Sequence, residues 1–325
     1  MTLAVLIVGC GGIAGGHDAA RPDGAWPRTH APAYRRAGGF RLAGCVEPDA
    51  ARRAAFMARW GVERGFATLG EAVEAGPFDI VSICSPTAAH AADLEAALRL
   101  APRAVFAEKP LTGRLAESER LAVAAREAGV ALAVNHTRRW APDVQALAAG
   151  LAAGRFGRVL GASACYSKGV RNNGTHLFDL LALLLGPVSV LAAGRAVVDH
   201  MAEDPTLPCL LEAGGVPVAV SVGDARAFAL FELLLLTEAG TLAMEDGGMA
   251  WRERRVVDSP HFPGYRALGS AEARPGRYDE AMTAAAVNLR EAVLAGAPLA
   301  CTGDHALAAE RVAEAVRAAA TPEPT

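Results

Sequence analysis

Lysine is almost absent from this chain of 325 residues. Lys109 and Lys168 are the only lysines among its 32 basic residues, and all the others are arginines. Positive charge at the surface is therefore supplied by arginine. A lysine is not a default choice in this sequence, which makes both positions candidates for a specific role.

An excess of positive charge is also missing. The 32 basic residues stand against 35 acidic ones, which gives a formal net charge of −3. Proteins that bind a phosphate backbone or an anionic membrane surface need a concentrated positive region. Long apolar runs are absent too, because Leu180–Leu185 and Leu233–Leu236 are far shorter than the roughly 20 residues that span a bilayer. The sequence therefore predicts no nucleic-acid partner and no membrane partner.

The six cysteines form no cluster. There is no C-x-x-C pair and no His/Cys spacing typical of a zinc site, so we expect no bound metal. Cys10, Cys45 and Cys84 lie in apolar, strand-like runs and are predicted to be small buried side chains. The apolar stretch Leu3–Val8 has no basic segment before it and leads directly into glycines, unlike a secretory signal. We therefore expect a cytoplasmic protein with reduced thiols.

The length suggests two domains, at roughly 150 residues per domain. In the first part, continuous apolar runs alternate with alanine-rich helical stretches, as in the βαβ units of a doubly wound parallel sheet. The predicted strands are Leu3–Val8, Phe40–Glu47, Asp79–Cys84, Ala104–Glu108 and Ala131–Val134. The predicted helices include Asp49–Trp60, Ala88–Leu100 and Ala116–Ala128. We assign residues 1–140 to a Rossmann-type α/β domain.

The second part of the chain has a different pattern. Strand-like segments follow one another, among them Val188–Val198, with turn signals such as Gly214-Gly215 between them. One apolar helix, His176–Leu185, interrupts them, and two helices precede a tail, Thr321–Thr325, that is expected to be disordered. We predict that residues 141–325 form an α+β domain built on a mostly antiparallel open sheet.

A glycine-rich turn follows the first predicted strand. Its sequence, Gly9-Cys10-Gly11-Gly12-Ile13-Ala14, matches the pattern G-x-G-x-x-[G/A]. In that pattern a tight turn and a bare backbone let a pyrophosphate approach amide N–H groups at a helix N-terminus. A glycine-rich structural turn is the alternative, but the position directly after a strand favours a dinucleotide site. The candidate contacts are Gly9, Gly11, Gly12, Ile13 and Ala14.

An acidic residue ends the second predicted strand. Glu47 can hydrogen-bond the hydroxyls of the adenosine ribose and repels a 2′-phosphate, which predicts NAD rather than NADP. It lies 36 residues after Gly11, whereas the usual distance is about 20. We attribute the excess to a proline-rich loop at residues 17–33, inserted before the next helix. Arg52 and Arg53 leave open a site for the 2′-phosphate of NADP.

Two further strand ends carry polar motifs. Ser85-Pro86 follows one strand at the carboxyl edge of the sheet, where open α/β sheets bind ligands. His90 is either a cofactor contact or an ordinary residue in the first turn of the next helix. Glu108-Lys109-Pro110 ends the following strand and directs a lysine into the same crevice.

Together these motifs resemble the Gfo/Idh/MocA oxidoreductase family, which includes glucose–fructose oxidoreductase and inositol dehydrogenase. The resemblance rests on the glycine turn, Glu47, Ser85-Pro86, Glu108-Lys109-Pro110 and Gly174-Thr175-His176-x-x-Asp179, and it extends over essentially the whole chain. It implies a nicotinamide cofactor in the first domain and a second domain that binds substrate and mediates oligomerisation. Family members mostly oxidise a ring hydroxyl of a sugar or cyclitol, or reduce a keto-sugar.

The resemblance also implies roles for single residues. Lys109 orients the substrate and stabilises charge on the reacting oxygen, and His176 is the general acid or base on that hydroxyl. Four residues before His176 the family often has aspartate, but this chain has Asn172, which cannot stabilise an imidazolium by charge. Either His176 works with a less basic ring, or Lys109 carries more of the proton transfer. The predicted cofactor contacts outside the glycine turn are Glu47, Ser85, Pro86, His90, Glu108 and Lys109.

The sequence thus predicts an NAD(H)-dependent oxidoreductase that acts on a secondary hydroxyl or keto group of a sugar, nucleotide sugar or cyclitol. Two alternatives stay open: an NAD-dependent glycosidase or lyase of the same family that oxidises its substrate transiently, and a redox-inactive protein that binds a nucleotide or sugar. By analogy with the family we expect a homodimer or homotetramer, since an exposed apolar sheet face is an aggregation liability. The candidate substrate contacts are Arg139, Tyr166, Lys168, Asn173 and Asp179.

Overall fold

The structure is a computed structural model and describes residues 1–22 and 24–320. The tail Thr321–Thr325, predicted from the sequence to be disordered, lies outside the described residues. None of the helices in the described part of the chain is long and apolar enough to cross a membrane.

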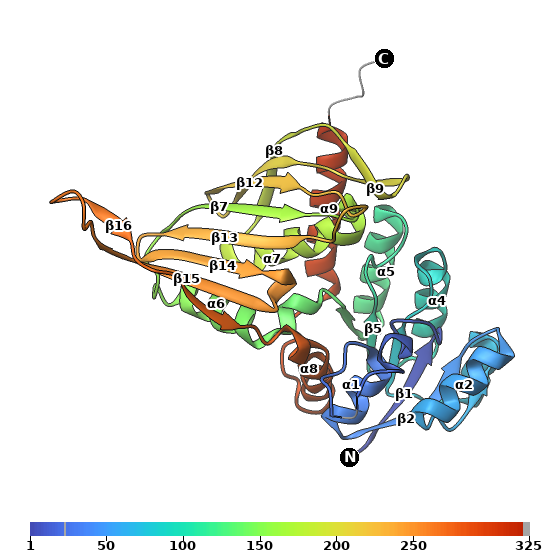
Figure 1. The fold of residues 1–325 in the computed structure, drawn as a ribbon. Coiled ribbons are helices and arrows are strands. Elements are labelled where there is room, and N and C mark those ends of the chain that lie inside the picture. Colours follow the sequence, from blue (N-terminus) through green and yellow to red (C-terminus); the bar gives the residue numbers. More distant parts are fainter. Residues whose placement is uncertain (23, 321–325) are drawn as a thin grey trace. The chain divides into compact units, whose positions relative to one another are not determined.

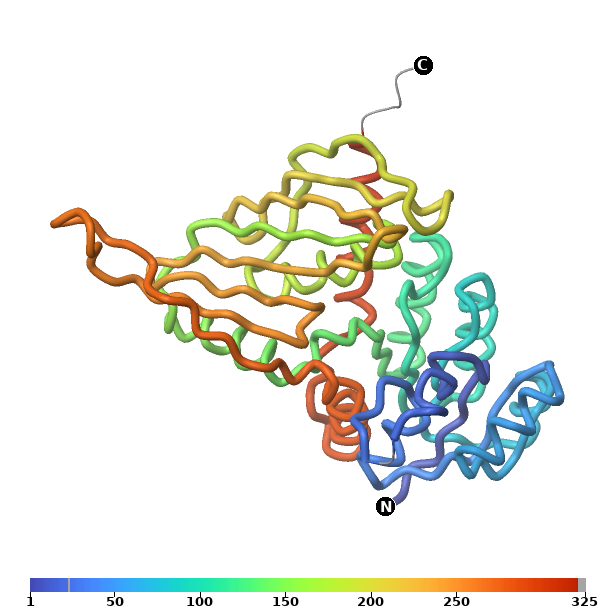
Figure 2. The backbone as a smooth tube through the Cα atoms, in the orientation of Figure 1, coloured from blue at the N-terminus to red at the C-terminus, as the bar shows by residue number. Residues whose placement is uncertain are grey.

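The chain divides into two compact units, which can be followed by colour in Figures 1 and 2. The first unit combines Met1–Trp140 with Asp279–Leu307. The second combines Ala141–Tyr278 with the residues from Ala308 onward. A single division of the chain at residue 140 therefore misses the return of Asp279–Leu307 to the first unit.

A six-stranded sheet forms the centre of the first unit. Its strand order is β3-β2-β1-β4-β5-β6, and all neighbouring pairs are parallel. The order reverses between β1 and β4, which is the switch point where doubly wound sheets bind ligands. The predicted Rossmann sheet is confirmed. Its strands are β1 (Leu3–Val8), β2 (Phe40–Val46), β3 (Gly65–Phe66), β4 (Ile80–Ile83), β5 (Ala104–Ala107) and β6 (Ala131–Val134).

Helices cover both faces of this sheet (Figure 1). One face, which presents Leu6 and Val105 among others, packs against α3 (Leu69–Ala75), α4 (Thr87–Arg99) and α5 (Leu115–Glu127). On the other face α1 (His30–Ala37) packs beside α8 (Ala281–Ala295), and the Tyr34 hydroxyl lies 2.7 Å from Ser82 Oγ. α2 (Ala50–Trp60) follows β2. Because both faces are covered, β1 is buried along its whole length, as its continuous apolar run predicts.

The first helix of the unit is interrupted by an insertion. Helix α1 begins only at His30, but the N–H groups of His30 and Ala31 donate to the carbonyl oxygens of Ile13 and Ala14, at 3.1 and 2.9 Å. Residues 15–29 are therefore a loop inserted into an otherwise continuing hydrogen-bond ladder. This insertion, placed slightly earlier than the predicted loop at 17–33, accounts for the long spacing before Glu47.

A mixed sheet forms the second unit. Its order is β16-β15-β14-β13-β7-β12-β11-β8, and β17 pairs with β15 beside this path. The pair β7–β12 is parallel, and the other pairs of this sheet are antiparallel, which confirms the predicted mostly antiparallel sheet. The strands are β7 (Val159–Tyr166), β8 (Val188–Ala193), β11 (Cys209–Ala213), β12 (Val216–Val222), β13 (Phe231–Thr237), β14 (Gly240–Glu245), β15 (Ala250–Asp258), β16 (Arg266–Leu268) and β17 (Glu272–Pro275).

The segment predicted as one strand, Val188–Val198, is divided in the structure. β8 ends at Ala193, and a separate two-stranded hairpin follows, formed by β9 (Val197–Met201) and β10 (Asp204–Thr206). Gly194 lies between them, and its N–H still donates to the carbonyl oxygen of Pro208, the residue before β11.

Helices cover one face of the second sheet and leave the other open (Figure 1). They are α6 (Pro142–Ala152), α7 (Thr175–Leu185) and α9 (Gly303–Ala319), whose residues from Ala308 onward belong to this unit. Along β11, Leu211 is buried against the helices while Leu210 is 53% exposed on the open face. Short helical turns complete the chain: η1 (Gly16–Asp18), η2 (Thr137–Trp140), η3 (Gly169–Gly174), η4 (Asp246–Gly248) and η5 (Tyr278–Glu280).

Candidate functional site

The glycine turn lies directly against the end of β4. Gly9 has a φ of +86°, and a Cβ added to it would lie 2.7 Å from the Cα and N atoms of Ser85. A side chain at Gly12 would meet the His17 ring at 2.5 Å. At Gly11 an added Cβ would meet nothing within 4 Å, so the backbone there borders open space. Gly9 is thus required by packing against backbone, a side chain at Gly12 would displace only the His17 ring, and Gly11 leaves the turn bare.

This turn offers a set of hydrogen-bond donors. Among the described residues, the N–H groups of Gly11, Gly12 and Ile13 donate no hydrogen bond, whereas the carbonyl oxygens of Gly11 and Gly12 accept from Gly16 and His17. Successive N–H groups that point one way form a cradle for an anion. The turn therefore fits the pyrophosphate of a dinucleotide.

Glu47 stands beside this turn at the end of β2. Its Oε2 accepts a hydrogen bond from the Cys10 N–H at 3.1 Å, and its Oε1 accepts from the Asp49 N–H at 3.1 Å. The Arg52 guanidinium lies 3.4 Å from the same Oε1. The carboxylate is thereby held in place next to the anion cradle, which suits the ribose hydroxyls of a bound dinucleotide. Arg52 lies close enough to reach a neighbouring 2′-phosphate.

His90 connects two of the predicted motifs. It is buried, with Nδ1 2.8 Å from the carbonyl oxygen of Pro110 and Nε2 2.9 Å from that of Ser85. Both ring nitrogens are engaged by the protein backbone. This placement favours a structural role, in which His90 ties the Ser85-Pro86 loop to the Lys109-Pro110 loop.

Glu108 points into the protein and supports the strand end that carries Lys109. Its Oε1 lies 2.9 Å from His30 Nε2 and accepts from Asn135 Nδ2 at 2.6 Å. Burial alone would raise the pKa of Glu108, but the contacts with His30 and Asn135, together with Lys109, hold that pKa below its usual value. Glu108 is therefore a buried carboxylate that fixes β5, β6 and α1 around the half-buried Lys109, a position that does not favour a cofactor contact.

A histidine that the sequence analysis does not single out lies near Lys109. His136 follows β6, and burial together with the positive charges of Lys109, Arg139 and Arg138 lowers the pKa of His136 to about 3. Arg139 is also buried and donates to the carbonyl oxygen of Ala300 at 3.3 Å. A predicted substrate residue, Arg139, and the predicted catalytic lysine thus both lie within electrostatic range of His136. The strand-end position after β6 is the signal that could have found His136.

In the second unit the predicted residues gather on one turn and the helix after it. Turn η3 is a π-helical turn that precedes α7, and Lys168 before it has a left-handed backbone with φ +70°. Asn172 Nδ2 donates to the Lys168 carbonyl oxygen at 3.0 Å, and Asn173 Nδ2 donates to that of Ser167 at 2.9 Å. His176 lies in the first turn of α7. An aspartate could not donate the Asn172 hydrogen bond, which gives the departure from the family pattern a physical reason.

Tyr166 and Asp179 lie in the interior of the second unit. The Tyr166 side chain is fully buried, and its hydroxyl donates to the Leu207 carbonyl oxygen at 2.9 Å and accepts from the Leu207 N–H at 3.2 Å. Asp179 is 1% exposed within α7. Their burial does not favour direct contact with a substrate.

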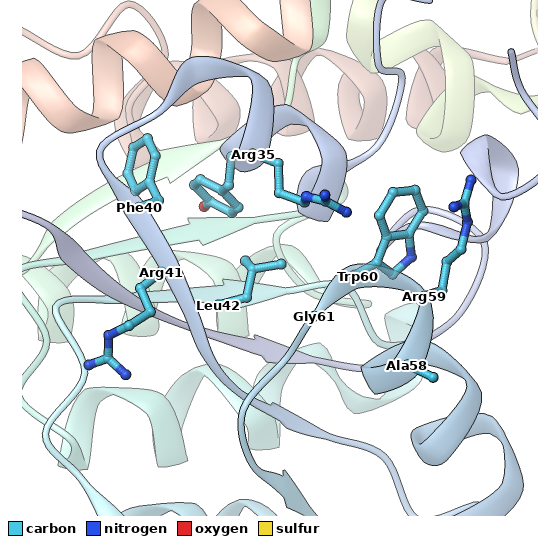
Figure 3. Close-up of a pocket in the computed structure, with 9 residues that line it drawn as sticks. Arg35, Phe40, Arg41, Leu42, Ala58, Arg59, Trp60 and Gly61 are labelled. Atoms are coloured by element: carbon cyan, nitrogen blue, oxygen red, sulfur yellow. The ribbon is translucent and has the colours of Figure 1, made fainter. Parts of the chain in front are cut away.

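Two buried thiols, Cys84 and Cys209, and a hollow in the first unit add no second reaction centre. All six cysteines are free, and burial raises the pKa of Cys209 to about 12 and that of Cys84 well above its usual range, so these thiols stay protonated. Within residues 1–22 and 24–320, no group of three His, Cys, Asp or Glu side chains is arranged to hold a metal ion. A hollow of about 460 Å³ in the first unit, shown in Figure 3, is lined by Arg35, Arg59 and Trp60 among others, and includes none of the predicted site residues.

The fold and the turn define a dinucleotide-binding Rossmann domain joined to an open-sheet α+β domain. Residues 3–136 match the model of the Gfo/Idh/MocA family, described as an oxidoreductase family with an NAD-binding Rossmann fold. Over these residues the chain matches the model of that oxidoreductase family, in agreement with the resemblance drawn from the motifs.

Named relatives agree with this assignment. D-apiose dehydrogenase of Paraburkholderia graminis is 26% identical over 67% of this chain and 63% of its own length. 1,5-Anhydro-D-fructose reductase of Ensifer adhaerens is 34% identical over 39% of this chain and 38% of its own length. The chain therefore spans less than two thirds of these relatives. A crystal structure of an oxidoreductase from Agrobacterium radiobacter in complex with NAD+, L-tartaric acid and magnesium has the same fold, with a TM-score of 0.79, 18% identity and coverage of 98% and 96% of the two chains.

The depressed pKa of His136 has a testable consequence. Between pH 6.5 and 3 the unfolded chain takes up a proton at this position and the folded chain does not, so the free energy of unfolding falls as the pH falls, by up to ~1.4 kcal/mol per pH unit. We expect the imidazole NMR signal of His136, assigned with His136→Gln, to stay unchanged between pH 8 and 5 in the folded protein. The same signal should titrate in urea. A midpoint near neutrality in the folded state would contradict the assignment.

Proposed function

We propose that the protein is an NAD(H)-dependent oxidoreductase that transfers hydride between nicotinamide and a secondary hydroxyl or keto group of a sugar, nucleotide sugar or cyclitol. The observation that carries the proposal is the anion cradle of the glycine turn with Glu47 fixed beside it. The sugar dehydrogenase and sugar reductase among its relatives support the substrate class. We also propose a cytoplasmic location.

The bound dinucleotide would supply the hydride acceptor or donor. The chain's own residues would manage the proton and the charge on the reacting oxygen. Lys109, with its strand end fixed by Glu108, would stabilise negative charge on that oxygen, because a nearby ammonium lowers the energy of an alkoxide. His176 would take up or release the hydroxyl proton. Asn172 would contribute by closing the turn before α7, since its amide donates to the Lys168 carbonyl oxygen.

We propose that the open face of the second sheet is covered by a second copy of the chain. One row across its central strands reads Leu210, Ala219, Ser163, Leu234 and Ala243 in register. These residues are small or apolar, and Leu210 and Leu236 are 53% and 42% exposed. An exposed row of small and apolar residues on a sheet is typical of a subunit interface.

Redox turnover can be tested on the purified protein by absorbance at 340 nm with a panel of sugars, cyclitols and nucleotide sugars. We expect a net change in NADH with at least one compound and, for Lys109→Ala, a kcat lower by about 10²- to 10⁴-fold with nearly unchanged NAD affinity. Lys109→Arg serves as the control that keeps the charge. Bound nucleotide without net turnover would contradict the dehydrogenase and point to transient redox chemistry or sensing, which mass spectrometry of the products separates.

The preference for NAD rests on Glu47. Replacing it with serine removes the charge that repels a 2′-phosphate and leaves Arg52 to attract one, so Glu47→Ser should raise kcat/KM for NADP relative to NAD by about tenfold or more. Glu63→Ser, an exposed glutamate paired with Arg41, is the matched control. An unchanged NADP/NAD ratio would place the selecting residue elsewhere.

The oligomeric state can be measured by sedimentation. We expect the protein to sediment as a homodimer or homotetramer at micromolar concentration, and Leu210→Asp to dissociate it, because a buried, unpaired charge is costly at an interface. Val123→Asp, at an exposed position on α5, is the control. A monomeric native protein would rule out this interface.

A further inference from the structure

The turn before α7 is held only in part by its own side chains, Asn172 and Asn173, which donate to the carbonyl oxygens of Lys168 and Ser167. It runs from Ser167 to Gly174, and Lys168 and Gly169 at its start have positive φ values of +70° and +84°. A π-helical turn follows, which is wider than an α-helical turn and is frequently found at functional sites. A non-glycine residue in the left-handed region is strained and persists only where its surroundings enforce it. Lys168 therefore needs support from outside the turn.

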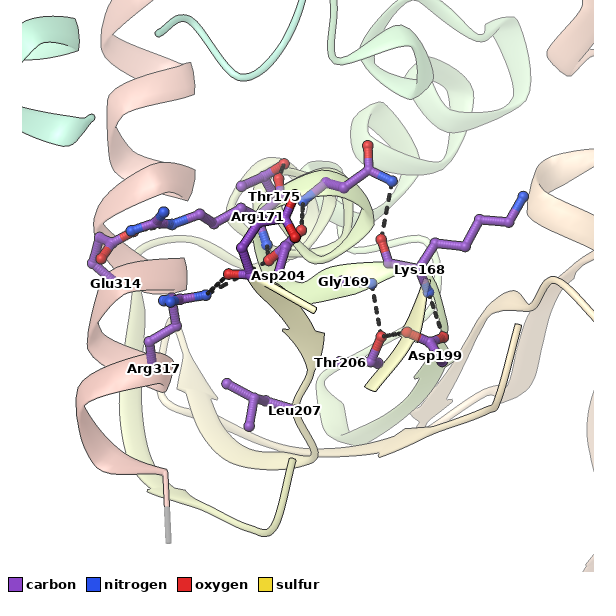
Figure 4. A network of polar contacts seen from close by, with 12 residues as sticks. Lys168, Gly169, Arg171, Thr175, Asp199, Asp204, Thr206, Leu207, Glu314 and Arg317 are labelled. Atoms are coloured by element: carbon purple, nitrogen blue, oxygen red, sulfur yellow. Dashed lines mark hydrogen bonds and ion pairs between the residues drawn. The ribbon is translucent and has the colours of Figure 1, made fainter. Parts of the chain in front are cut away.

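The β9–β10 hairpin supplies that support (Figure 4). Asp199 Oδ2 accepts from the Lys168 N–H at 2.8 Å, and Thr206 Oγ1 accepts from the Gly169 N–H at 2.7 Å while it donates to Asp199 Oδ1 at 2.7 Å. Asp204 accepts from the next two donors, the N–H groups of Arg171 and Asn172, at 2.9 and 2.8 Å. Four N–H groups of the turn are thus bound by three side chains of one hairpin.

These anchors are shielded from water. Asp199 and Asp204 are 5% exposed and Thr206 is fully buried, so solvent cannot replace a lost contact. The turn and the hairpin also match in shape, because a Cβ on Gly169 would lie 2.1 Å from Asp204 Oδ2. Hydrogen bonds to a carboxylate are stronger than those to a neutral acceptor. The hairpin therefore fixes the turn in one conformation.

We propose that Asp199, Asp204 and Thr206 are positioning residues for substrate binding. They lie behind the turn and act through it: the hairpin sets the backbone that presents the Lys168 ammonium and leads into His176. The substrate's KM thereby depends on a hairpin that touches neither substrate nor cofactor. This inference rests on the proposed function, since His176 acts on the substrate there and Lys168 is a candidate substrate contact.

A pair of variants at Thr206 tests the proposal. Thr206→Val keeps the shape but removes both hydrogen bonds of the hydroxyl, whereas Thr206→Ser keeps them. We expect Thr206→Val to raise the substrate KM by about tenfold or more, with kcat within about threefold and NAD affinity unchanged, and Thr206→Ser to restore the native KM. Asp204→Asn should act like Thr206→Val. Asp258→Asn, at a fully solvated position on β15, is the control.

Limited proteolysis measures how firmly the turn before α7 is held, independently of any substrate. Endoproteinase Lys-C cleaves after lysine, and Lys109 and Lys168 are the only lysines in the sequence, so the fragment masses identify cleavage after Lys168. We expect Thr206→Val and Asp204→Asn to accelerate cleavage after Lys168 by about tenfold or more relative to Thr206→Ser and Asp258→Asn. Native KM values together with native cleavage rates in both variants would overturn the proposal, even if thermal stability fell. If the native protein turns over no substrate, the proposed function fails, and the cleavage rates alone then decide whether the hairpin fixes the turn.

Discussion

The carboxyl edge of the first sheet depends on one close approach between two backbones. β1 and β4 end so near each other that the backbone of Ser85 occupies the space where a side chain of Gly9 would lie. This contact fixes the glycine turn against the Ser85-Pro86 loop. His90 in turn fixes the Lys109-Pro110 loop to the Ser85-Pro86 loop, because its ring contacts the carbonyl oxygens of Ser85 and Pro110. Three loops that are far apart in the sequence are thereby held at one edge by close backbone packing and by the hydrogen bonds of the His90 ring.

In both units, buried carboxylates fix nearby backbone and side chains by accepting hydrogen bonds from them. Glu47 binds the Cys10 N–H, and Asp199 and Asp204 bind N–H groups of the turn before α7. Glu108 binds His30 and Asn135 instead. A buried carboxylate is stable only when such donors compensate its lost hydration, so each also constrains the backbone or side chains around it. The positions of the candidate site residues follow from these fixed charges.

Local sequence patterns correctly predicted the elements whose structure depends on residues close together in the sequence. The continuous apolar runs marked β1 and the other buried parallel strands, and the glycine spacing marked the turn that packs against Ser85. Contacts between distant segments left no comparable signal. The sequence around Tyr166 does not reveal that its hydroxyl donates a hydrogen bond to the Leu207 carbonyl oxygen. The sequence of α8 likewise does not reveal that Met282 contacts Asn135. His90 was ambiguous for the same reason, since its partners lie on two other loops.

The inserted loop separates the glycine turn from helix α1 in the sequence, but the two remain hydrogen-bonded in the structure. In an uninterrupted Rossmann helix, the first N–H groups after the turn are followed by a continuous ladder whose dipole favours a bound anion. Here the N–H groups of His30 and Ala31 return to the carbonyl oxygens of Ile13 and Ala14, so the ladder resumes after the loop and α1 stays aligned with the turn. The two ends of the loop are joined by Asp18, which accepts from the Arg28 N–H and the Thr29 hydroxyl. The entropic cost of closing a loop grows only slowly with its length. An insertion whose ends are joined in this way therefore lengthens the sequence between the glycine turn and Glu47, while Glu47 still lies beside the turn.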